Sequence, residues 1–193
     1  MEIFLLSAAS LALYLRYDRW TVSGGPARTR LAFPAGLLCM AAATADMLIR
    51  SVPAAAASPV RAALCFAAAL LSLLLLVYTL FFSLPFGETY RDPSRKRPVC
   101  RVGMYALCRH PGFLWFFFLY LFLWLGAPGF YSLWGGVSLC LSNLIYIAVQ
   151  DAWTFPRTFS DYGDYRLSVP FLIPTPGSLR AALGTGRTRR EHH

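Results

Sequence analysis

The residues best suited to chemistry lie in a short basic segment directly before a strongly apolar run. This segment, residues 101–113, gathers four residues suited to binding or catalysis: Gly103, Tyr105, Arg109 and His110. Pro111 follows them and suits the first turn of a helix, where its missing N–H costs nothing. Arg109 and His110 would then lie beside a helix N-terminus, whose free N–H groups and positive dipole end attract a carboxylate or phosphate. The segment therefore predicts a site for an anionic group.

Each of these residues also has a purely structural interpretation. Arg109 can act as an interfacial anchor whose charged head reaches the lipid headgroups. His110 alone is more often a hydrogen-bonded interface residue than a catalyst, and Gly103 with Pro111 alone indicates a turn and a helix start. The functional interpretation gains weight only where these residues combine with others.

A second polar segment follows the last apolar run. It contains Gln150 and Asp151 and, further along, Tyr162, Tyr165 and Arg166. An acidic residue at a helix C-terminus opposes the helix dipole, so Asp151 needs a partner such as Arg109 or a cationic ligand. A structural ion pair would satisfy Asp151 equally well, and the tyrosines could form an interfacial aromatic belt.

The elements that must position these residues are membrane helices. Hydrophobic residues make up 57% of the 193 residues and charged residues only 14%, against roughly 45–50% and 25% in soluble domains. The apolar residues come in long runs rather than in stripes, which predicts an all-α, polytopic membrane bundle. The net charge of +9 would suit nucleic acid, but such spans exclude that class, and anionic lipid headgroups are the expected counter-charge.

Five apolar runs predict about five transmembrane helices. They are residues 3–15, 31–49, 60–86, 111–126 and 130–149, most of them near the roughly 20 residues that a crossing needs. A signal peptide is the alternative for the first run. It is disfavoured because Glu2 stands where a basic region belongs, and residues 16–20 carry no small-residue cleavage site.

The distribution of Lys and Arg predicts the orientation. Four lie in residues 16–30, six in residues 86–110 and six after Asp151, which leaves only Arg50 and Arg61 of the 18 for the other side. The positive-inside rule then places the N-terminus outside and the C-terminus in the cytoplasm. Arg50 lies four residues after Asp46, which predicts an ion pair on one helix.

The chain divides by sequence into three regions. Residues 1–85 hold three spans, residues 86–174 hold the two polar segments and a helical hairpin closed by residues 126–129, and residues 175–193 resemble a basic disordered tail. The final His192-His193 could be a tag remnant. Five cysteines without metal-type spacing are expected to be reduced packing residues, so neither a disulfide framework nor a metal site is predicted.

Together the two polar segments resemble a family of membrane methyltransferases, which includes isoprenylcysteine carboxyl methyltransferase and the phospholipid methyltransferases. That family carries Gly-x-Tyr-x-x-x-Arg-His-Pro-x-Tyr before a helical hairpin, then Glu-Glu, then Tyr-x-x-Tyr-x-x-x-Val-Pro-x-x-Ile-Pro. Residues 103–113 are similar to the first element and residues 162–174 to the last. The resemblance covers residues 86–174 and leaves the first spans unmatched.

The resemblance implies a membrane-embedded enzyme that uses S-adenosylmethionine, bound from the cytoplasmic side, on a lipophilic acceptor entering from the bilayer. Prenylated cysteine carboxylates and phospholipids are acceptors of this class. It implies catalytic roles for Arg109, Asp151 and Arg166. It also implies that the cofactor site is formed by Gly103, Tyr105, Arg109, His110, Pro111, Gln150, Asp151, Tyr162 and Tyr165. Aromatic faces would suit the sulfonium, and Arg109 would suit the cofactor's carboxylate.

Several positions depart from the family pattern. Gln150-Asp151 stands for Glu-Glu, Phe113 for the motif tyrosine, and Trp115 for a frequent glycine, which would crowd the cofactor. Two alternatives therefore stay open. One is a sterol-reductase-type enzyme that uses NADPH, a class that shares the Arg-His-Pro element. The other is a catalytically silent lipid-binding protein of the same fold.

Overall fold

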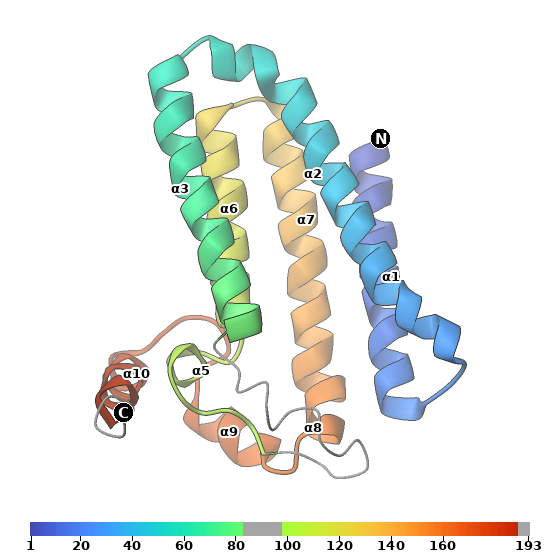
Figure 1. Ribbon diagram of the computed structural model, residues 1–193, viewed down its shortest axis with the longest axis vertical. Coiled ribbons are helices and arrows are strands. Elements are labelled where there is room, and N and C mark those ends of the chain that lie inside the picture. The colour runs from blue at the N-terminus through green and yellow to red at the C-terminus, as the bar shows by residue number, and fades with distance from the viewer. Residues whose placement is uncertain (83–97, 189–193) are drawn as a thin grey trace. The chain divides into compact units, whose positions relative to one another are not determined.

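The computed structural model describes residues 1–82 and 98–188, and the regular elements in these residues are helices (Figure 1). The long helices are α1 (Glu2–Ser23), α2 (Ala32–Ala56), α3 (Pro59–Val77), α6 (Pro111–Gly126) and α7 (Phe130–Val149). The short ones are the 3₁₀ turn η1 (Ala27–Leu31), the π turns η2 (Tyr78–Phe82) and η3 (Gln150–Thr154), and the helices α5 (Met104–Leu107), α8 (Phe155–Thr158), α9 (Tyr162–Ser168) and α10 (Pro176–Thr188). Some residues used for the charge count or named in the tail lie outside the described residues, namely Arg91, Arg95, Lys96, Arg97, Arg189, Arg190, His192 and His193.

Three helical stretches are long and apolar enough to cross a membrane, by length and composition. They are Ala27–Ala56, Pro59–Phe81 and Phe130–Thr158. Helix α6 is apolar but has only 16 residues, and α1 does not belong to this set. The structure thus confirms an all-helical protein with membrane-spanning candidates, whereas five crossings remain a prediction.

Two helices extend beyond their predicted ends. Helix α1 continues to Ser23, not to residue 15, because polar side chains at a helix end do not stop the backbone pattern. It ends where Gly24 adopts a positive φ of 74° and donates its N–H to the Trp20 carbonyl. Helix α2 runs to Ala56, past the predicted end at residue 49, and includes Pro53 in its last turn. Helices α6 and α7 have the predicted bounds.

The chain divides into two compact units, each formed by two stretches. The first unit is Met1–Leu73 with Phe116–Thr154, and the second is Leu74–Trp115 with Phe155–His193. This division differs from the predicted sequence regions, because the hairpin α6–α7 belongs mostly to the unit that contains α1 and α2.

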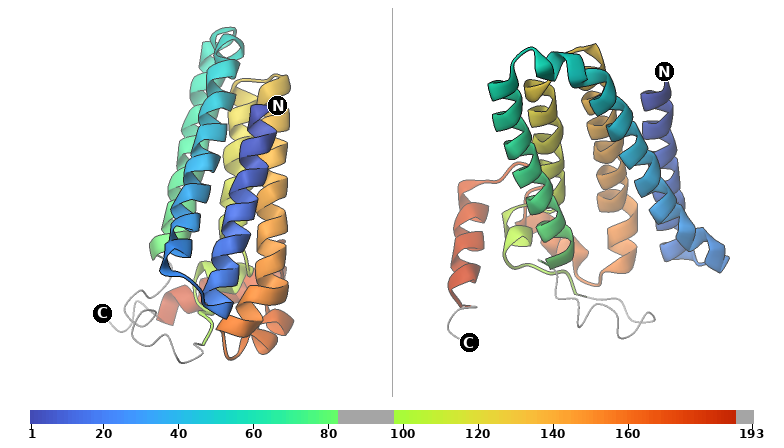
Figure 2. Two further views of the ribbon diagram at one scale, coloured as in Figure 1. Left: turned by 90° about the vertical axis from the view of Figure 1, so that its right-hand side faces the viewer. Right: turned by 45° about the horizontal axis from the view of Figure 1, so that its top comes forward.

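The first unit is organised around α1, which packs against both α2 and α7 (Figures 1 and 2). Arg50 of α2 forms an ion pair with Glu2 at the start of α1, at 3.3 Å, so α1 and α2 are antiparallel. Arg50 also bonds to Asp46 at 2.8 Å, which confirms the pair predicted from their spacing. The Ser7 hydroxyl lies 2.8 Å from that of Ser142 on α7. Hydroxyl contacts of this kind hold helices together where apolar burial gives little selectivity.

The second unit contains the short helices α5, α8, α9 and α10, and α10 lies where a disordered tail is predicted. Helix α10 covers residues 176–188, although the composition predicts disorder from residue 175 onward. Its start is capped reciprocally: the Ser178 N–H donates to the Thr175 hydroxyl at 3.1 Å, and the Thr175 N–H donates to the Ser178 hydroxyl at 2.9 Å. Pro176 occupies the first turn, where proline is favoured. This capping pattern outweighs the glycine-rich composition.

Candidate functional site

The two predicted motif segments meet in the second unit through their main chains. The Arg109 N–H donates to the Pro170 carbonyl at 2.9 Å, and the His110 N–H donates to the Phe171 carbonyl at 3.3 Å. Residues about 60 positions apart are thereby joined side by side, directly before α6 begins. The structure therefore brings residues 103–113 and 162–174 into one site.

The Arg109 side chain reinforces this junction. Its Nη1 donates to the Arg166 carbonyl at 2.7 Å and to the Val169 carbonyl at 3.2 Å. Its guanidinium carbon also lies 5.5 Å from the centre of the Phe171 ring. The Nη1 group of Arg109 thus caps the C-terminal end of α9, where carbonyl groups attract a cation. The Arg166 side chain is exposed, and Arg166 enters the site through its main chain.

His110 is buried between two aromatic rings. Its side chain is 6% exposed. The Phe155 ring stacks on it at a centroid distance of 5.7 Å, and the Phe171 ring meets it edge-on at 5.0 Å. The stacked ring comes from α8 and the edge-on ring from the segment after α9, so His110 lies where both parts of the second unit converge. Neither phenylalanine was singled out in the sequence.

A chain of hydrogen bonds connects two predicted tyrosines. The Tyr165 hydroxyl donates to the Tyr105 carbonyl at 2.7 Å, and the Tyr105 hydroxyl donates to the Thr79 carbonyl at 3.3 Å. Burial raises the pKa of Tyr105 to about 12 and also raises that of Tyr165, so both phenols stay protonated. Tyr162 is 3% exposed and packs against Tyr165 at 5.9 Å. The tyrosines act as donors and packing groups here.

Gly103 and Pro111 fix the path of the chain around this cluster. Gly103 precedes α5 with a φ of 62°, a region that strongly favours glycine. Pro111 is fully buried and begins α6, as predicted. The backbone between them is therefore forced through one short helix, α5, before it reaches Arg109 and His110.

An acidic anchor that the sequence pattern does not predict lies at the start of α9. Asp161 accepts the Val99 N–H at 2.7 Å and the Arg101 Nη2 at 2.9 Å. Burial alone would raise the pKa of Asp161, but these donors outweigh it and hold the pKa below its usual value. Arg101 also lies over the Tyr165 ring, 5.9 Å from its centre, so this ring already carries a cation. A favoured N-cap residue before a helix was the available signal.

Gln150 and Asp151 belong to the first unit, whereas the other predicted site residues belong to the second. Both lie in the π turn η3, and Asp151 is 4% exposed. π turns inside helices are rare and occur frequently at functional sites. Of the predicted site residues, the structure therefore collects eight in the second unit: Gly103, Tyr105, Arg109, His110, Pro111, Tyr162, Tyr165 and Arg166.

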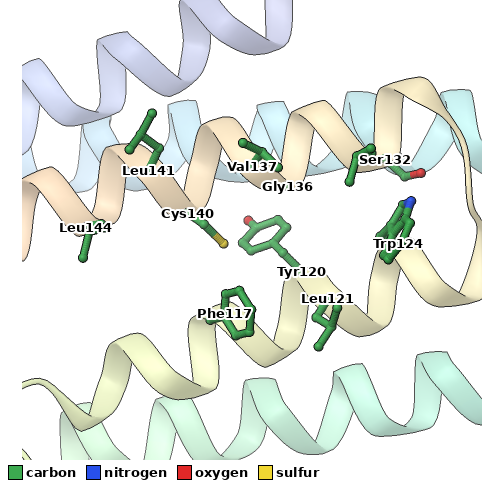
Figure 3. A pocket seen from close by; sticks show the side chains of 11 residues that line it. Phe117, Tyr120, Leu121, Trp124, Ser132, Gly136, Val137, Cys140, Leu141 and Leu144 are labelled. Carbon is green, nitrogen blue, oxygen red and sulfur yellow. The ribbon is translucent and has the colours of Figure 1, made fainter. Parts of the chain in front are cut away.

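An apolar cleft of about 360 Å³ lies in the first unit between α6 and α7 (Figure 3). Its α7 wall combines small residues spaced by four with larger apolar ones: Ser132, Gly136 and Cys140 alternate with Leu133, Val137, Leu141 and Leu144. Two of its hydroxyls are bonded within the protein: the Tyr120 hydroxyl lies 2.7 Å from that of Thr44, and the Ser132 hydroxyl donates to the Ala127 carbonyl at 2.7 Å. The cleft therefore presents mainly hydrocarbon, within the size range of roughly 300–1,000 Å³ of small-molecule sites.

The protein is all-helical in its described residues and contains helices long and apolar enough to span a membrane. It also has a polar cluster where the two motif segments meet. Comparisons with protein-family models, with curated proteins and with solved structures found no match. What the chain does is therefore argued from its own residues.

Proposed function

We propose that the chain is a membrane-embedded methyltransferase that transfers the methyl group of S-adenosylmethionine to a lipophilic acceptor. The observation that carries the proposal is the junction of the two motif segments. Residues that resemble the first and last elements of the family pattern are joined by main-chain bonds from Arg109 and His110 to Pro170 and Phe171. A chance likeness between two distant segments would not require them to meet.

The residues at this junction suit the parts of the cofactor. Methyl transfer needs the sulfonium and the acceptor aligned and shielded from water, so positioning is the main requirement. Tyr105 and the rings around His110 supply aromatic surfaces for a soft cation. A carboxylate on the cofactor would find Arg109 beside the N-terminus of α6. The bound cofactor supplies the electrophilic methyl group.

The acceptor class is supported by the cleft between α6 and α7. Its wall offers mainly hydrocarbon, which suits the tail of a lipid-like molecule. A water-soluble acceptor would need polar anchors, whereas the hydroxyls of Tyr120 and Ser132 are bonded within the protein. The proposed substrates are therefore molecules that partition into the bilayer.

Ligand binding by the purified chain in lipid nanodiscs tests the proposal. We expect calorimetry to show that S-adenosylhomocysteine binds. The ligand should also raise the unfolding temperature, because a hundredfold excess over the dissociation constant adds about 2.7 kcal/mol to the free energy of unfolding. The resemblance assigns Asp151 to the cofactor, so Asp151→Asn, which keeps the side-chain shape and removes its charge, should weaken binding at least tenfold. Asp46→Asn, which alters an acid at the Arg50 end of the first unit, is the matched control.

Two results would contradict the proposal. One is a folded sample that gains no stability from S-adenosylhomocysteine. The other is stabilisation by NADPH alone, which would favour the reductase class instead. Methyl transfer from radiolabelled cofactor into a total lipid extract would then identify the acceptor.

A further inference from the structure

Asp18 is a buried carboxylate near the end of α1 that the two motif segments do not include. It is 3% exposed, although it stands in the polar stretch that follows the first apolar run. Its Oδ1 accepts the Tyr146 hydroxyl at 2.9 Å, and its Oδ2 accepts the Thr154 hydroxyl at 2.9 Å. The Gln150 side chain also hydrogen-bonds to it. A buried carboxylate is tolerated only with such partners.

The three donors lie along one side of the helix that contains the π turn. Tyr146 is in the last turn of α7, Gln150 begins η3, and Thr154 ends it. These donors are spaced by four residues. The Asp18 carboxylate therefore contacts a residue before the π turn, the first residue of the turn and its last residue. A π turn replaces the usual backbone ladder with a less favourable one and needs outside support. Asp18 supplies that support on both sides of the irregular backbone.

Helix α1 is itself held firmly where Asp18 lies. The Tyr14 ring, one turn earlier, stacks on the Tyr146 ring at 5.2 Å between centroids. One turn of α2 approaches so closely that a Cβ on Gly36 would meet the Tyr14 ring at 2.9 Å. The carboxylate is therefore presented from a fixed position.

We propose that Asp18 is a positioning residue that holds the π turn Gln150–Thr154 and thereby sets the place of Asp151. Asp151 belongs to this turn and is itself 4% exposed. The part of the proposal that concerns cofactor binding rests on the proposed function. The proposal makes α1, which lies outside the motif segments, the support of the turn that contains Asp151.

Hydrogen exchange and ligand titration on the full chain in nanodiscs test this proposal. In Asp18→Leu, which removes all three acceptor contacts, amides of residues 150–155 should exchange at least tenfold faster, and the dissociation constant for S-adenosylhomocysteine should rise at least tenfold. In the methyl-transfer assay, the KM for the cofactor should rise more than kcat falls. Asp18→Asn retains an acceptor oxygen of the same shape and should stay within threefold of the parent in each measurement. Asp46→Asn should match the parent.

The outcomes separate this proposal from the proposed function. Unchanged exchange at residues 150–155 in Asp18→Leu, or faster exchange spread evenly over the first unit, would overturn it. If Asp18→Leu does not fold, Thr154→Val removes one donor at constant shape and should give the same local effect on a smaller scale. A parent chain that binds no S-adenosylhomocysteine would refute the proposed function. Faster exchange confined to residues 150–155 in Asp18→Leu would still show that Asp18 holds the turn.

Discussion

Asp161 connects residues 99–101 to the start of α9. Its carboxylate accepts the Val99 N–H and the Arg101 guanidinium, and these donors lower its pKa below the usual 3.8. A carboxyl group whose pKa is lower when folded stabilises the protein above its unfolded pKa, and this stability is lost as the pH falls through the folded value. Asp161 therefore contributes at neutral pH.

The resulting prediction concerns acid stability. Asp161→Asn should destabilise the protein by about 1 kcal/mol at pH 7, since the contact is part-exposed and charge-assisted. The difference from the parent should shrink as the pH falls below about 4, where the carboxyl becomes protonated. Thermal unfolding in detergent between pH 7 and pH 3 measures it. Asp164→Asn, which changes an exposed acid in the first turn of α9, is the matched control.

Single residues also show the limit of sequence reasoning at this scale. The motif residues Arg109 and His110 were predictable, because their types and spacing are unusual before an apolar run. The aromatic partners of His110, Phe155 and Phe171, were not predictable, and neither was the contact of Asp18 with the π turn. A sequence pattern does not say which side chains of distant segments meet. Asp18 and Thr154 lie 136 positions apart, and only the packing of α1 along α7 brings them together.

At the scale of elements, apolar runs predicted the helices α6 and α7 to the residue, because glycines and prolines bound the hairpin. Ends within polar sequence were predicted poorly, as α1 shows. The π turn η3 was not predictable, since its backbone depends on contacts from another helix. The start of α10 was encoded by the Thr175 and Ser178 cap, which glycine-rich composition obscured.

Two adjacent glycines of α7 give a test of how the helices pack. A Cβ on Gly135 would collide with the Ile3 side chain and lie 3.2 Å from Met47, whereas a Cβ on Gly136 would meet the Tyr120 Cβ at 3.4 Å, an ordinary contact. Both alanine variants gain about 1 kcal/mol of helix propensity. Overpacking at Gly135 costs about 1–3 kcal/mol.

We therefore expect Gly136→Ala to be as stable as the parent or more so, and Gly135→Ala to be less stable than Gly136→Ala. Unfolding midpoints in the same detergent compare the two variants directly. Equal midpoints would mean that α1 and α2 do not pack on α7 as described.

The cleft between α6 and α7 gives a further prediction. Cys140→Trp should fill it and lower kcat/KM for a lipophilic acceptor at least tenfold, while the dissociation constant for S-adenosylhomocysteine changes less than threefold. Ile145→Trp, at an exposed α7 position outside the cleft wall, is the matched control. Equal loss of cofactor binding and turnover in Cys140→Trp would show that the cleft is not a separate acceptor site.

At the scale of the whole molecule, the charge distribution predicts the topology. Within the first unit, Arg50 pairs with Glu2 at the start of α1, and Arg16 and Arg19 lie near its other end. Reporter tags inserted at Gly25 and at Ala57 should therefore be found on opposite sides, Gly25 in the cytoplasm. A tag at Pro128 should share the side of Ala57 if α6 crosses the membrane. If the tags at Gly25 and Ala57 were found on the same side, α2 would not cross the membrane.

The junction between Arg109-His110 and Pro170-Phe171 also dictates when this protein can be complete during its synthesis. The two N–H groups are made about 60 residues before the carbonyls that receive them, and buried main-chain groups are costly to leave without acceptors. A nascent chain that already contains α7 but in which residue 171 has not yet been synthesised therefore exposes an incomplete cluster. Cells that stall translation in this interval should present these intermediates to chaperones and membrane proteases.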